Sequence, residues 1–477
     1  MSELAGSGSR HGDLAGSGSR HGDLAGSGSR HGDLVEVAIG IASMAGGGEQ
    51  VEAFVARGVE TEVRAYQGQV EHFSSAASAG VGVRVVKDGR QGFAYAGSLE
   101  DDVIAGVLAE ARDNAAFATP DEHVALGVPD GVAAAAVEVW DESLGSWPTD
   151  AKVEMALEVE RAARAADSRV RQVSSADYED ASVEAAIATS TGIAASSRRT
   201  VCHVSVSVIA GEGDDSHSGV GFSVGRGPHA LDPDRAVADA LERATRLIGG
   251  TKARSGQVTV VFDPRVTSTL LGVLASSLSG EAVTKGRSLF AGRVGEEVAA
   301  PEVTLVDDPT DSRAYGAARY DAEGLASRSN ALIERGSLRG FVFDTISAHR
   351  AGTVSTASAV RGGYASTPVA SCRALALAPG TLDAAGVLKS VGDGIYVQSI
   401  TGVHSGVNPV SGDFSVGAEG LVIRGGELAE PVREVTVAST IQRMLMGIVA
   451  IGSDVEWLPG VAAGQTIAIE AMTLSGT

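Results

Sequence analysis

Residues 81–90 read Val-Gly-Val-Arg-Val-Val-Lys-Asp-Gly-Arg, and the fold of the first part of the chain can be worked out from them. Val81, Val83 and Val85 alternate with other residues, which is the period-two pattern of a strand with one well-buried face. Asp88-Gly89 then predicts a tight hairpin turn. We therefore expect a β-hairpin here.

The sequence on both sides of this hairpin predicts a mixture of helices and strands. Helix-like periodicity covers 34–44 and 99–115, and strand-like runs cover 51–55, 61–66 and 69–73. A stretch rich in Pro and Gly at 119–133 has the composition of a linker. The first unit is thus a small α+β domain over residues 34–120.

The rest of the chain divides into two larger units. A helix from Thr149-Asp150 to about 166, strands around 202–208 and 219–224, and a helix opening at Asp232-Pro233 indicate a middle α+β domain at 121–250. A strand at 258–262, a helix at 266–278 and many short strands follow, with modest helices near 381–391 and 441–448. We predict a large β-rich C-terminal domain at 251–477, and overall a multi-domain α+β fold with mixed or antiparallel sheets.

Composition excludes several classes of protein. Lys and Arg number 38 against 60 Asp and Glu, a net charge of −22, and aromatic residues are only 4%, so binding to nucleic acid or to anionic membranes is not expected. Two cysteines cannot form a disulfide framework. No apolar run approaches the roughly 18 to 20 residues that span a bilayer. These features favour a cytoplasmic protein.

Residues 1–33 consist mostly of a repeat. Three identical copies of Leu-Ala-Gly-Ser-Gly-Ser-Arg-His-Gly-Asp start at Leu4, Leu14 and Leu24. One Leu and one Ala per copy cannot offset the entropy of ordering ten residues, so a disordered tail is expected. The alternative is a metal site that collects His11, His21 and His31.

The sequence offers few catalytic constellations. No two of the ten histidines are three or four residues apart, which excludes a local two-histidine metal motif on one helix. His203 and His217 could converge from adjacent strands, and with Asp215 and Ser223 they form the hypothesis of an autonomous hydrolase with an unrecognised site. Gly221–Gly225 matches Gly-x-Ser-x-Gly, but it lies in a strand-like run where an ordinary Gly-rich strand is expected.

Two further candidates are a cysteine and an acidic pair. Cys372 could act as a nucleophile, but no base lies near it in sequence, and a buried small residue is the favoured interpretation. Asp307-Asp308 could hold a cation, although its place between an apolar run and Pro309 is more typical of a strand-ending turn.

Phrases in the C-terminal unit occur together as a set. They are Gly392–Val397, Gly402–Gly420 with its Gly-Val-Asn-Pro-Val-Ser-Gly-Asp core, and Pro431–Ala438, joined by shorter matches at 289–295, 361–364 and 470–476 and by the first-domain phrase 82–90. On these phrases the chain resembles the TldD/TldE (PmbA) family. The resemblance covers essentially everything after the repeat.

The resemblance implies a cytosolic heterodimeric protease whose TldD-type subunit holds zinc on a His-Glu-x-x-x-His helix, with a later Cys as third ligand. In this chain Gly272 and Ser277 occupy the two His positions and Val273 the Glu position, and 457–463 contains no Cys. The chain is therefore closest to the TldE/PmbA-type subunit. It is expected to carry no catalytic residue and no metal ligand, with zinc in a TldD-like partner.

The expected function is that of a non-metal-binding subunit in a zinc metalloprotease that processes or degrades unfolded or extended peptides. Asn408, Pro409, Gly412 and Asp413 are the candidate residues for contact with the peptide or the partner, and a purely structural hairpin turn is the competing interpretation. Besides the autonomous hydrolase, the other alternative is a regulatory protein that binds a DNA-processing enzyme, as the family's label "modulator of DNA gyrase" suggests.

Overall fold

The hairpin expected at 81–90 is present in the computed structural model of the chain, which describes residues 34–477. Strand β2 (Gln69–Lys87) is followed by β3 (Arg90–Ala96), and Asp88 and Gly89 between them have φ values of 50° and 69°. Positive φ at both central residues is the geometry of a type I′ turn, which confirms the predicted turn. Residues 81–86 are buried on both faces of β2, not on one as the alternation suggested. The repeat and its three histidines lie outside the described residues.

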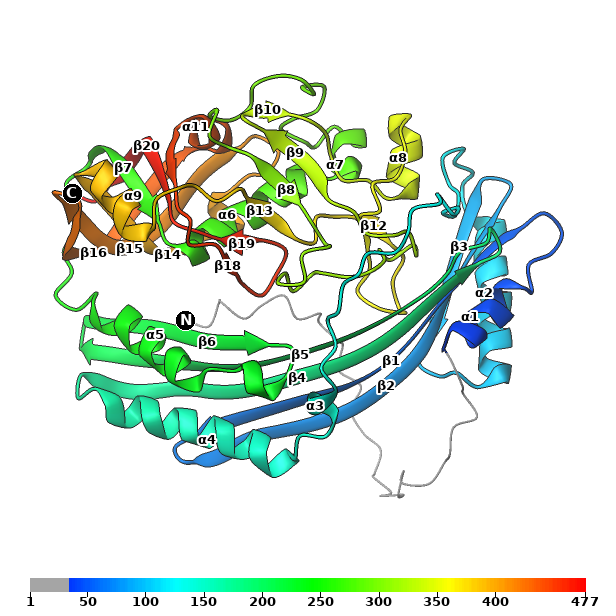
Figure 1. Cartoon of the computed structure of the whole chain (residues 1–477), viewed down its shortest axis with the longest axis horizontal. Coiled ribbons are helices and arrows are strands. Elements are labelled where there is room, and N and C mark those ends of the chain that lie inside the picture. The colour runs from blue at the N-terminus through cyan, green and yellow to red at the C-terminus, as the bar shows by residue number, and fades with distance from the viewer. Residues whose placement is uncertain (1–33) are drawn as a thin grey trace. The chain divides into compact units, whose positions relative to one another are not determined.

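Six antiparallel strands form the sheet to which this hairpin belongs (Figure 1). Their order is β3-β2-β1-β4-β5-β6, so strands of the predicted units 34–120 and 121–250 share one sheet. The division at 120 and 250 stays a prediction. The remaining strands of this sheet are β1 (Gln50–Tyr66), β4 (Val170–Thr189), β5 (Ala194–Glu212) and β6 (Asp215–Gly225).

Four helices cover one face of this sheet. Apolar residues of β1 such as Val51 and Val55 pack against the first two helices, and Val63 packs in the cluster that contains the other two. These helices begin and end close to the predicted positions. They are α1 (Leu34–Ala42), α2 (Asp101–Phe117), α4 (Thr149–Ala166) and α5 (Pro233–Thr245), and the short turns α3 (Glu142–Gly145) and η1 (Pro228–Ala230) lie between them in sequence.

Glycines on β6 explain the Gly-x-Ser-x-Gly match. A Cβ atom at Gly221 would lie 1.8 Å from the carbonyl oxygen of Ala236, and one at Gly219 would lie 2.1 Å from that of Ala240. Both carbonyls belong to α5, so only glycine lets the helix pack this closely on the strand. This stretch is a Gly-rich strand, as favoured from the sequence.

The C-terminal part (251–477) is built around a second six-stranded sheet in the order β16-β15-β14-β7-β20-β17. β14 and β7 run parallel and the other neighbours antiparallel, which confirms the predicted mixed α+β fold. Its strands are β7 (Gly256–Phe262), β14 (Gly394–Thr401), β15 (Asp413–Arg424), β16 (Glu427–Thr440), β17 (Ile448–Ile451) and β20 (Ile467–Ser475).

Shorter elements complete the C-terminal part. The helices are α6 (Pro264–Ser277), α7 (Gly280–Thr284), α8 (Thr345–Ala351), α9 (Ala384–Val391), α10 (Val403–Gly406) and α11 (Ile441–Met446). The strands are β8 (Leu305–Asp307), β9 (Asn330–Glu334), β10 (Ser337–Leu338), β11 (Ala359–Val360), β12 (Val369–Ala370), β13 (Leu375–Leu377), β18 (Glu456–Trp457) and β19 (Ala463–Gly464).

The C-terminal part contacts the face of the first sheet that the helices leave free. At one end, the Arg361 guanidinium lies 4.4 Å from the centre of the Phe54 ring on β1. At the other, Arg265 of α6 lies 4.3 Å from the centre of the Phe222 ring on β6. The two ends of the sheet are therefore both tied to the C-terminal part.

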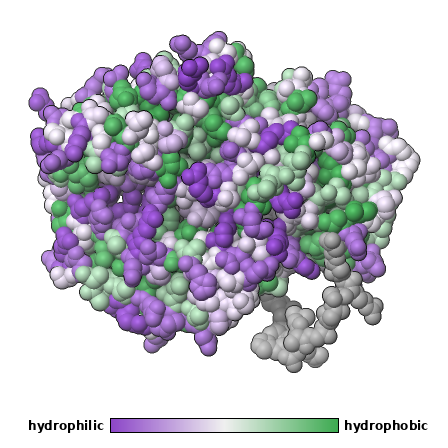
Figure 2. All heavy atoms as spheres, viewed as in Figure 1, coloured by the Kyte–Doolittle hydropathy of each residue, from purple (hydrophilic) through white to green (hydrophobic). Residues whose placement is uncertain are grey.

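The surface is mixed in character. On the face shown in Figure 2, hydrophilic and hydrophobic residues are interspersed, and polar residues cover much of the view. None of the helices within residues 34–477 combines the length and the apolar character needed to cross a membrane.

Candidate functional site

Helix α6 carries Gly272, Val273 and Ser277, the residues expected from the resemblance to stand at the zinc-motif positions, and its sequence explains why the helix forms. Asp263 precedes it and accepts a hydrogen bond from the backbone N–H of Arg265 at 2.9 Å, and Pro264 supplies a preset φ in the first turn. Leu271 and Leu274 face the large core of the C-terminal part. The helix is thus capped at its N-terminus and packed along one side.

The N-terminus of α6 is bound to the first sheet's helices through Asp263. This carboxylate is 3% exposed and accepts two hydrogen bonds from Arg243 of α5, at 2.9 and 2.8 Å. The hydroxyl of Tyr396 on β14 donates a further one at 2.8 Å. A buried carboxylate needs such charged partners, so Asp263 fixes α6 against both α5 and β14.

The three zinc-motif positions on α6 offer no ligand set. A Cβ atom built on Gly272 meets nothing within 4 Å, so this position faces open space and has no side chain to reach across it. Val273 packs against the apolar core. Ser277 is 1% exposed and its hydroxyl donates to the carbonyl of Pro409 at 2.9 Å. Since zinc takes Cys, His or carboxylate ligands, the donors at these positions do not fit it.

Ala462 and Gly464, at the end of the segment where the resemblance led us to expect a Cys, lie against α6. The hydroxyl of Ser268 donates to the carbonyl of Ala462 at 2.8 Å, and a Cβ atom at Gly464 would lie 1.9 Å from the carbonyl oxygen of Pro264. The fold therefore places 462–464 beside the helix. Across residues 34–477 no group of three or more His, Cys, Asp or Glu side chains is suited to hold a metal ion.

The turn at 408–413 reaches the other end of α6 through the Ser277–Pro409 hydrogen bond. The Asn408 side-chain oxygen accepts from the backbone N–H groups of Val410 and Ser411 at 2.9 and 3.1 Å. Gly412 has φ of +85°, and a Cβ there would come within 2.2 Å of the Gln442 side chain. Asn408 and Gly412 thus shape the turn.

Most residues of this turn are exposed, and Gly412 is the buried one. Pro409 and Asp413 are exposed, and Val410 is 52% exposed. Asp413 accepts a hydrogen bond from the Ser411 hydroxyl at 2.6 Å. Of the four predicted contact residues, Asn408, Pro409 and Asp413 are exposed and Gly412 is buried, while the Asn408 side chain also holds the turn in shape. The Val410 side chain, which the sequence did not single out, presents the apolar surface.

A buried charge network connects the first sheet to the C-terminal part, and sequence reasoning missed it. Arg84 of β2 lies 2.5 Å from Glu52 of β1 and 3.5 Å from Glu323, and Arg361 lies 2.8 Å from Glu52. All four side chains are at most 3% exposed. The one available signal was an arginine within the apolar run 81–86.

Ionisation within this network is uneven. Burial opposes the charge on Glu52, but Arg84 and Arg361 outweigh it, so the pKa of Glu52 lies below its ordinary value. Burial raises the pKa of Glu323 to about 7, against the attraction of Arg84. Thr345 also donates to Glu323, through its backbone N–H at 2.9 Å and its hydroxyl at 2.7 Å.

The histidines proposed for an autonomous hydrolase do not meet. On the β5–β6 pair, His203 lies opposite Val224 and His217 opposite Ala210, seven residues along the strands. At roughly 3.3 Å per residue this separates them by about 23 Å, and the odd spacing puts them on opposite faces. The Ser223 hydroxyl accepts from the backbone N–H of Asp232. The hypothesis that His203 and His217 converge is wrong.

His203 belongs instead to a polar strip on the sheet face that the helices leave free. Its ring lies 3.8 Å from Glu179, and Arg64 donates to Asp177 at 2.6 Å in the adjacent row of side chains. Burial raises the pKa of Glu179, and the nearby charges of Glu62 and Asp177 add to this. The strip lies on the same face as the Phe54 and Phe222 rings that contact the C-terminal part.

Cys372 and Asp307 are both buried residues with structural roles. Cys372 is fully buried and burial holds the pKa of its thiol well above the ordinary value, which confirms a buried small residue. Asp307 ends β8 and accepts from the backbone N–H groups of Arg373 and Ala374 at 2.8 and 2.7 Å. Asp308 accepts from Thr310 N–H at 3.0 Å, so the pair forms a strand-ending turn.

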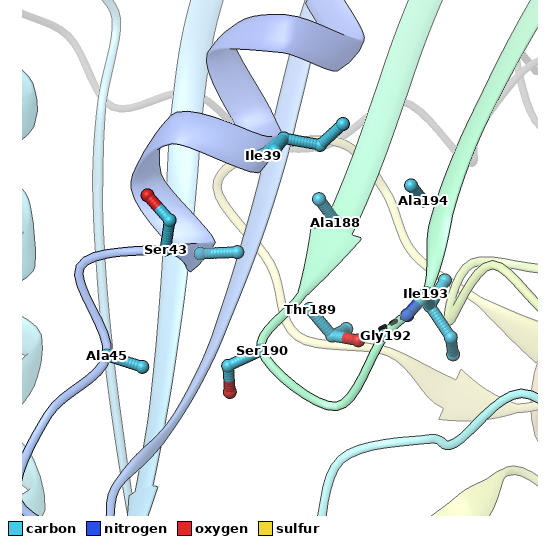
Figure 3. Close-up of a pocket in the computed structure, with 10 residues that line it drawn as sticks. Ile39, Ser43, Ala45, Ala188, Thr189, Ser190, Gly192, Ile193 and Ala194 are labelled. Carbon is cyan, nitrogen blue, oxygen red and sulfur yellow. Dashed lines mark hydrogen bonds between the residues drawn. The ribbon is translucent and has the colours of Figure 1, made fainter.

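A shallow hollow of about 490 Å³ lies between α1 and the β4–β5 hairpin (Figure 3). Ile39 and Ser43 line it from α1 and the residues that follow, and Thr189 and Ile193 from the hairpin. Thr189 is occupied in the hairpin, since its hydroxyl accepts from the N–H of Ile193 at 3.0 Å. The polar side chains that line the hollow are the hydroxyls of Ser43, Thr189 and Ser190.

The chain is similar to proteins of known family along nearly its whole described length. Family models match residues 51–115 as PmbA/TldA metallopeptidase domain 1, 142–248 as the central domain and 255–476 as the C-terminal domain. The metalloprotease PmbA of Escherichia coli O157:H7 is 25% identical over 443 residues, which cover 93% of this chain and 95% of that protein. The metalloprotease TldD homolog of Haemophilus influenzae is 29% identical over 83% of this chain and 87% of its own length.

Solved structures of similar proteins have the same fold. A Thermotoga maritima protein described as a modulator of a DNA gyrase has a TM-score of 0.84 and 25% identity, and the alignment covers 92% of this chain and 99% of that one. TldE from Thermococcus kodakarensis has the same fold, with a TM-score of 0.82 at 22% identity over 93% of this chain and 99% of its own. The three consecutive domain matches lead to one conclusion: the chain belongs to the PmbA/TldD metallopeptidase family.

Proposed function

We propose that this chain is the TldE/PmbA-type subunit of a heterodimeric peptidase, with the catalytic zinc held by a TldD-like partner. The observation that carries the proposal is helix α6. Its family zinc positions hold Gly272, Val273 and Ser277, of which the first has no side chain, the second packs into the core and the third is bonded to Pro409. An active pair then needs its metal from the other chain.

The role left to this chain is to bind and deliver unfolded or extended peptides. Extended peptides can add to strands through main-chain hydrogen bonds, which tolerate many sequences. The polar strip around Glu179 and His203 offers charged side chains that suit contact with the polar groups of such peptides. We assign the turn to the partner interface because its apolar Val410 side chain is accessible and its main chain is anchored on α6.

Co-expression tests the proposal. This chain and a TldD-like chain with an intact His-Glu-x-x-x-His helix are each produced alone. The TldD-like chain is also co-produced with this chain and with its Gly272→Ala variant, and each preparation is given an unfolded polypeptide. Cleavage is expected only when both chains are present, and the Gly272→Ala pair should match the wild-type pair because that position faces open space. Full cleavage by this chain alone would refute the proposal.

The alternative function, a regulatory protein that binds a DNA-processing enzyme, needs a separate experiment. Two similar solved proteins are described as modulators of DNA gyrase, which favours a search for a DNA-processing enzyme as partner. The net charge of −22 disfavours direct contact with DNA, so capture of such an enzyme should persist after nuclease treatment. The proposed compartment is the cytoplasm.

A further inference from the structure

One arginine on the free face of the first sheet has no partner. Arg199 lies on β5 four residues before His203, so both side chains point to the face that the helices leave free. Within residues 34–477, the Arg199 guanidinium makes no hydrogen bond and no ion pair. Arg64 on the same face, in contrast, donates to Asp177 at 2.6 Å. The chain has 60 Asp and Glu residues, and none of those in the described range is placed to pair with Arg199.

The neighbours of Arg199 across the sheet are uncharged. Val183 of β4 lies opposite Arg199, and Gly58 of β1 lies opposite Val183. Gly58 has no side chain, so this row of the sheet rises little above the backbone. The pair formed by Glu179 and His203 lies four residues away, which is about 13 Å along the strands. The row of Arg199 therefore has space for an external group and contains no acidic side chain that would repel an anion.

A second cation lies close to Arg199. Arg226, which follows β6, donates to the carbonyl of Thr200 at 3.3 Å. It also donates to the carbonyl of Ala314 at 2.7 Å, and its guanidinium lies 5.3 Å from the centre of the Tyr315 ring. These contacts hold the Arg226 side chain in place without neutralising its charge. Burial lowers the pKa of Arg226, and the positive charge of Arg199 lowers it further, so the two guanidinium groups repel each other.

The surroundings of Arg199 disfavour its charge although the side chain is accessible. Burial by the protein around it lowers the pKa of the Arg199 guanidinium, and the negative charge of Glu60 offsets this only in part. A bound anion would replace the water that the guanidinium has lost and would relieve its repulsion from Arg226. A carboxylate is the best match in shape, because it accepts two parallel N–H bonds from one guanidinium.

We propose that Arg199, together with the charge of Arg226, binds a carboxylate group of the extended peptide that this subunit takes up. The inference rests on the proposed peptide-binding role and assigns that role a specificity. Two groups of a peptide share this chemistry, the C-terminal carboxylate and the side chains of Asp and Glu. The net charge of −22 repels acidic peptides, so a preference for the carboxylate form requires a local site.

Fluorescence anisotropy of labelled peptides with this chain alone tests the site. An unstructured peptide without Asp or Glu is prepared as the free acid and as the C-terminal amide, and a second, amidated pair carries Glu or Gln at its centre. The wild type should bind at least one carboxylate form about tenfold more tightly than its amide. A preference for the free acid identifies a C-terminal site, and a preference for the Glu peptide a side-chain site. Equal affinities within both pairs, or binding of none of the four peptides, would overturn the proposal.

Matched variants assign the preference to Arg199. Arg199→Met should abolish it, and Arg199→Lys should retain part of it, because lysine keeps the charge but not the bidentate geometry. Arg335→Met is the control, since Arg335 is an exposed arginine in the turn between β9 and β10, and it should keep the full preference. A preference that survives in Arg199→Met, or that both Met variants lose equally, contradicts the assignment.

Cleavage by the co-expressed pair separates this inference from the proposed function. The pair should cleave the preferred carboxylate peptide with a kcat/KM about tenfold above that for its amide. A pair that cleaves both forms equally well keeps its peptidase role and contradicts the carboxylate site. A pair that cleaves neither form, while this chain binds the carboxylate peptide through Arg199, contradicts the peptidase role and supports the carboxylate site alone.

Discussion

Replacing Arg84 by Met should destabilise the chain strongly, because it removes a cation that two buried carboxylates share. The guanidinium lies 2.5 Å from Glu52 and 3.5 Å from Glu323, and all three side chains are at most 1% exposed. Met has a similar length but no charge, so both carboxylates lose a cation that no water can replace. Arg361 still reaches Glu52 at 2.8 Å, so Glu323 is the carboxylate that loses most.

Breaking a buried ion pair by removing one partner typically costs about 3 to 5 kcal/mol, because the remaining charge stays in a medium of low polarity. We expect Arg84→Met to fall in this range. Adding Glu323→Gln removes the carboxylate that is left without its cation, so the double variant should regain part of the loss, on the order of 1 to 3 kcal/mol.

Urea unfolding followed by circular dichroism measures the effect. Arg171→Met is the matched control, since its pair with Glu212 lies at the surface and half of its side chain is in solvent, and it should leave the unfolding midpoint nearly unchanged. A loss below about 1 kcal/mol for Arg84→Met, or no recovery in the double variant, would refute the view that this network ties the two parts of the chain together.

Three more outcomes follow from single positions. Folding raises the pKa of Glu323 from 4.5 to about 7, so the native chain holds more protons in that window and the free energy of unfolding falls as pH rises through it. Glu323→Gln should remove up to ~3 kcal/mol of this fall, measured by urea unfolding at a series of pH values. Gly221→Ala should lower the stability of the chain by at least about 1 to 3 kcal/mol, because its Cβ meets the α5 backbone. Gly272→Ala, in open space within a helix, should raise the stability by roughly 0.5 to 1 kcal/mol. Thermal unfolding measures both changes. Ser277→Ala leaves the Pro409 carbonyl without its donor, so hydrogen exchange in 408–413 should speed up by about tenfold or more, and unchanged exchange would contradict that anchoring role.

Local signals in the sequence predicted much of the fold. Asp88-Gly89 and Asp232-Pro233 specify a turn and a helix start through chemistry confined to a few residues, and both are present where expected. The long strand β1 was predicted as two short ones because Gly58 and the charged residues after it interrupt the alternation. In the structure Gly58 lies where a Cβ would be 2.9 Å from the carbonyl of Ser182, so glycine continues the strand instead of ending it.

Contacts between distant residues set the limit of prediction. Ser277 and Pro409 are far apart in sequence, and neither residue type indicates that one hydrogen bond joins α6 to the turn. Arg84 looked like the polar side of a half-buried strand because the carboxylates that neutralise it come from β1 and from residue 323. The absence of His and Glu at 272, 273 and 277 could be read directly from the sequence, because the capacity to bind zinc depends on which residue types are present.

The most direct test of the central claim is the zinc content of the purified pair. After dialysis, metal analysis of this chain co-purified with a TldD-like partner should give one zinc per pair, and this chain alone should retain none. The count should not change when Ser277 is replaced by Ala, since its hydroxyl is bonded to Pro409. Two zinc ions per pair, or stoichiometric zinc on this chain alone, would contradict the claim that α6 has lost the family's metal site.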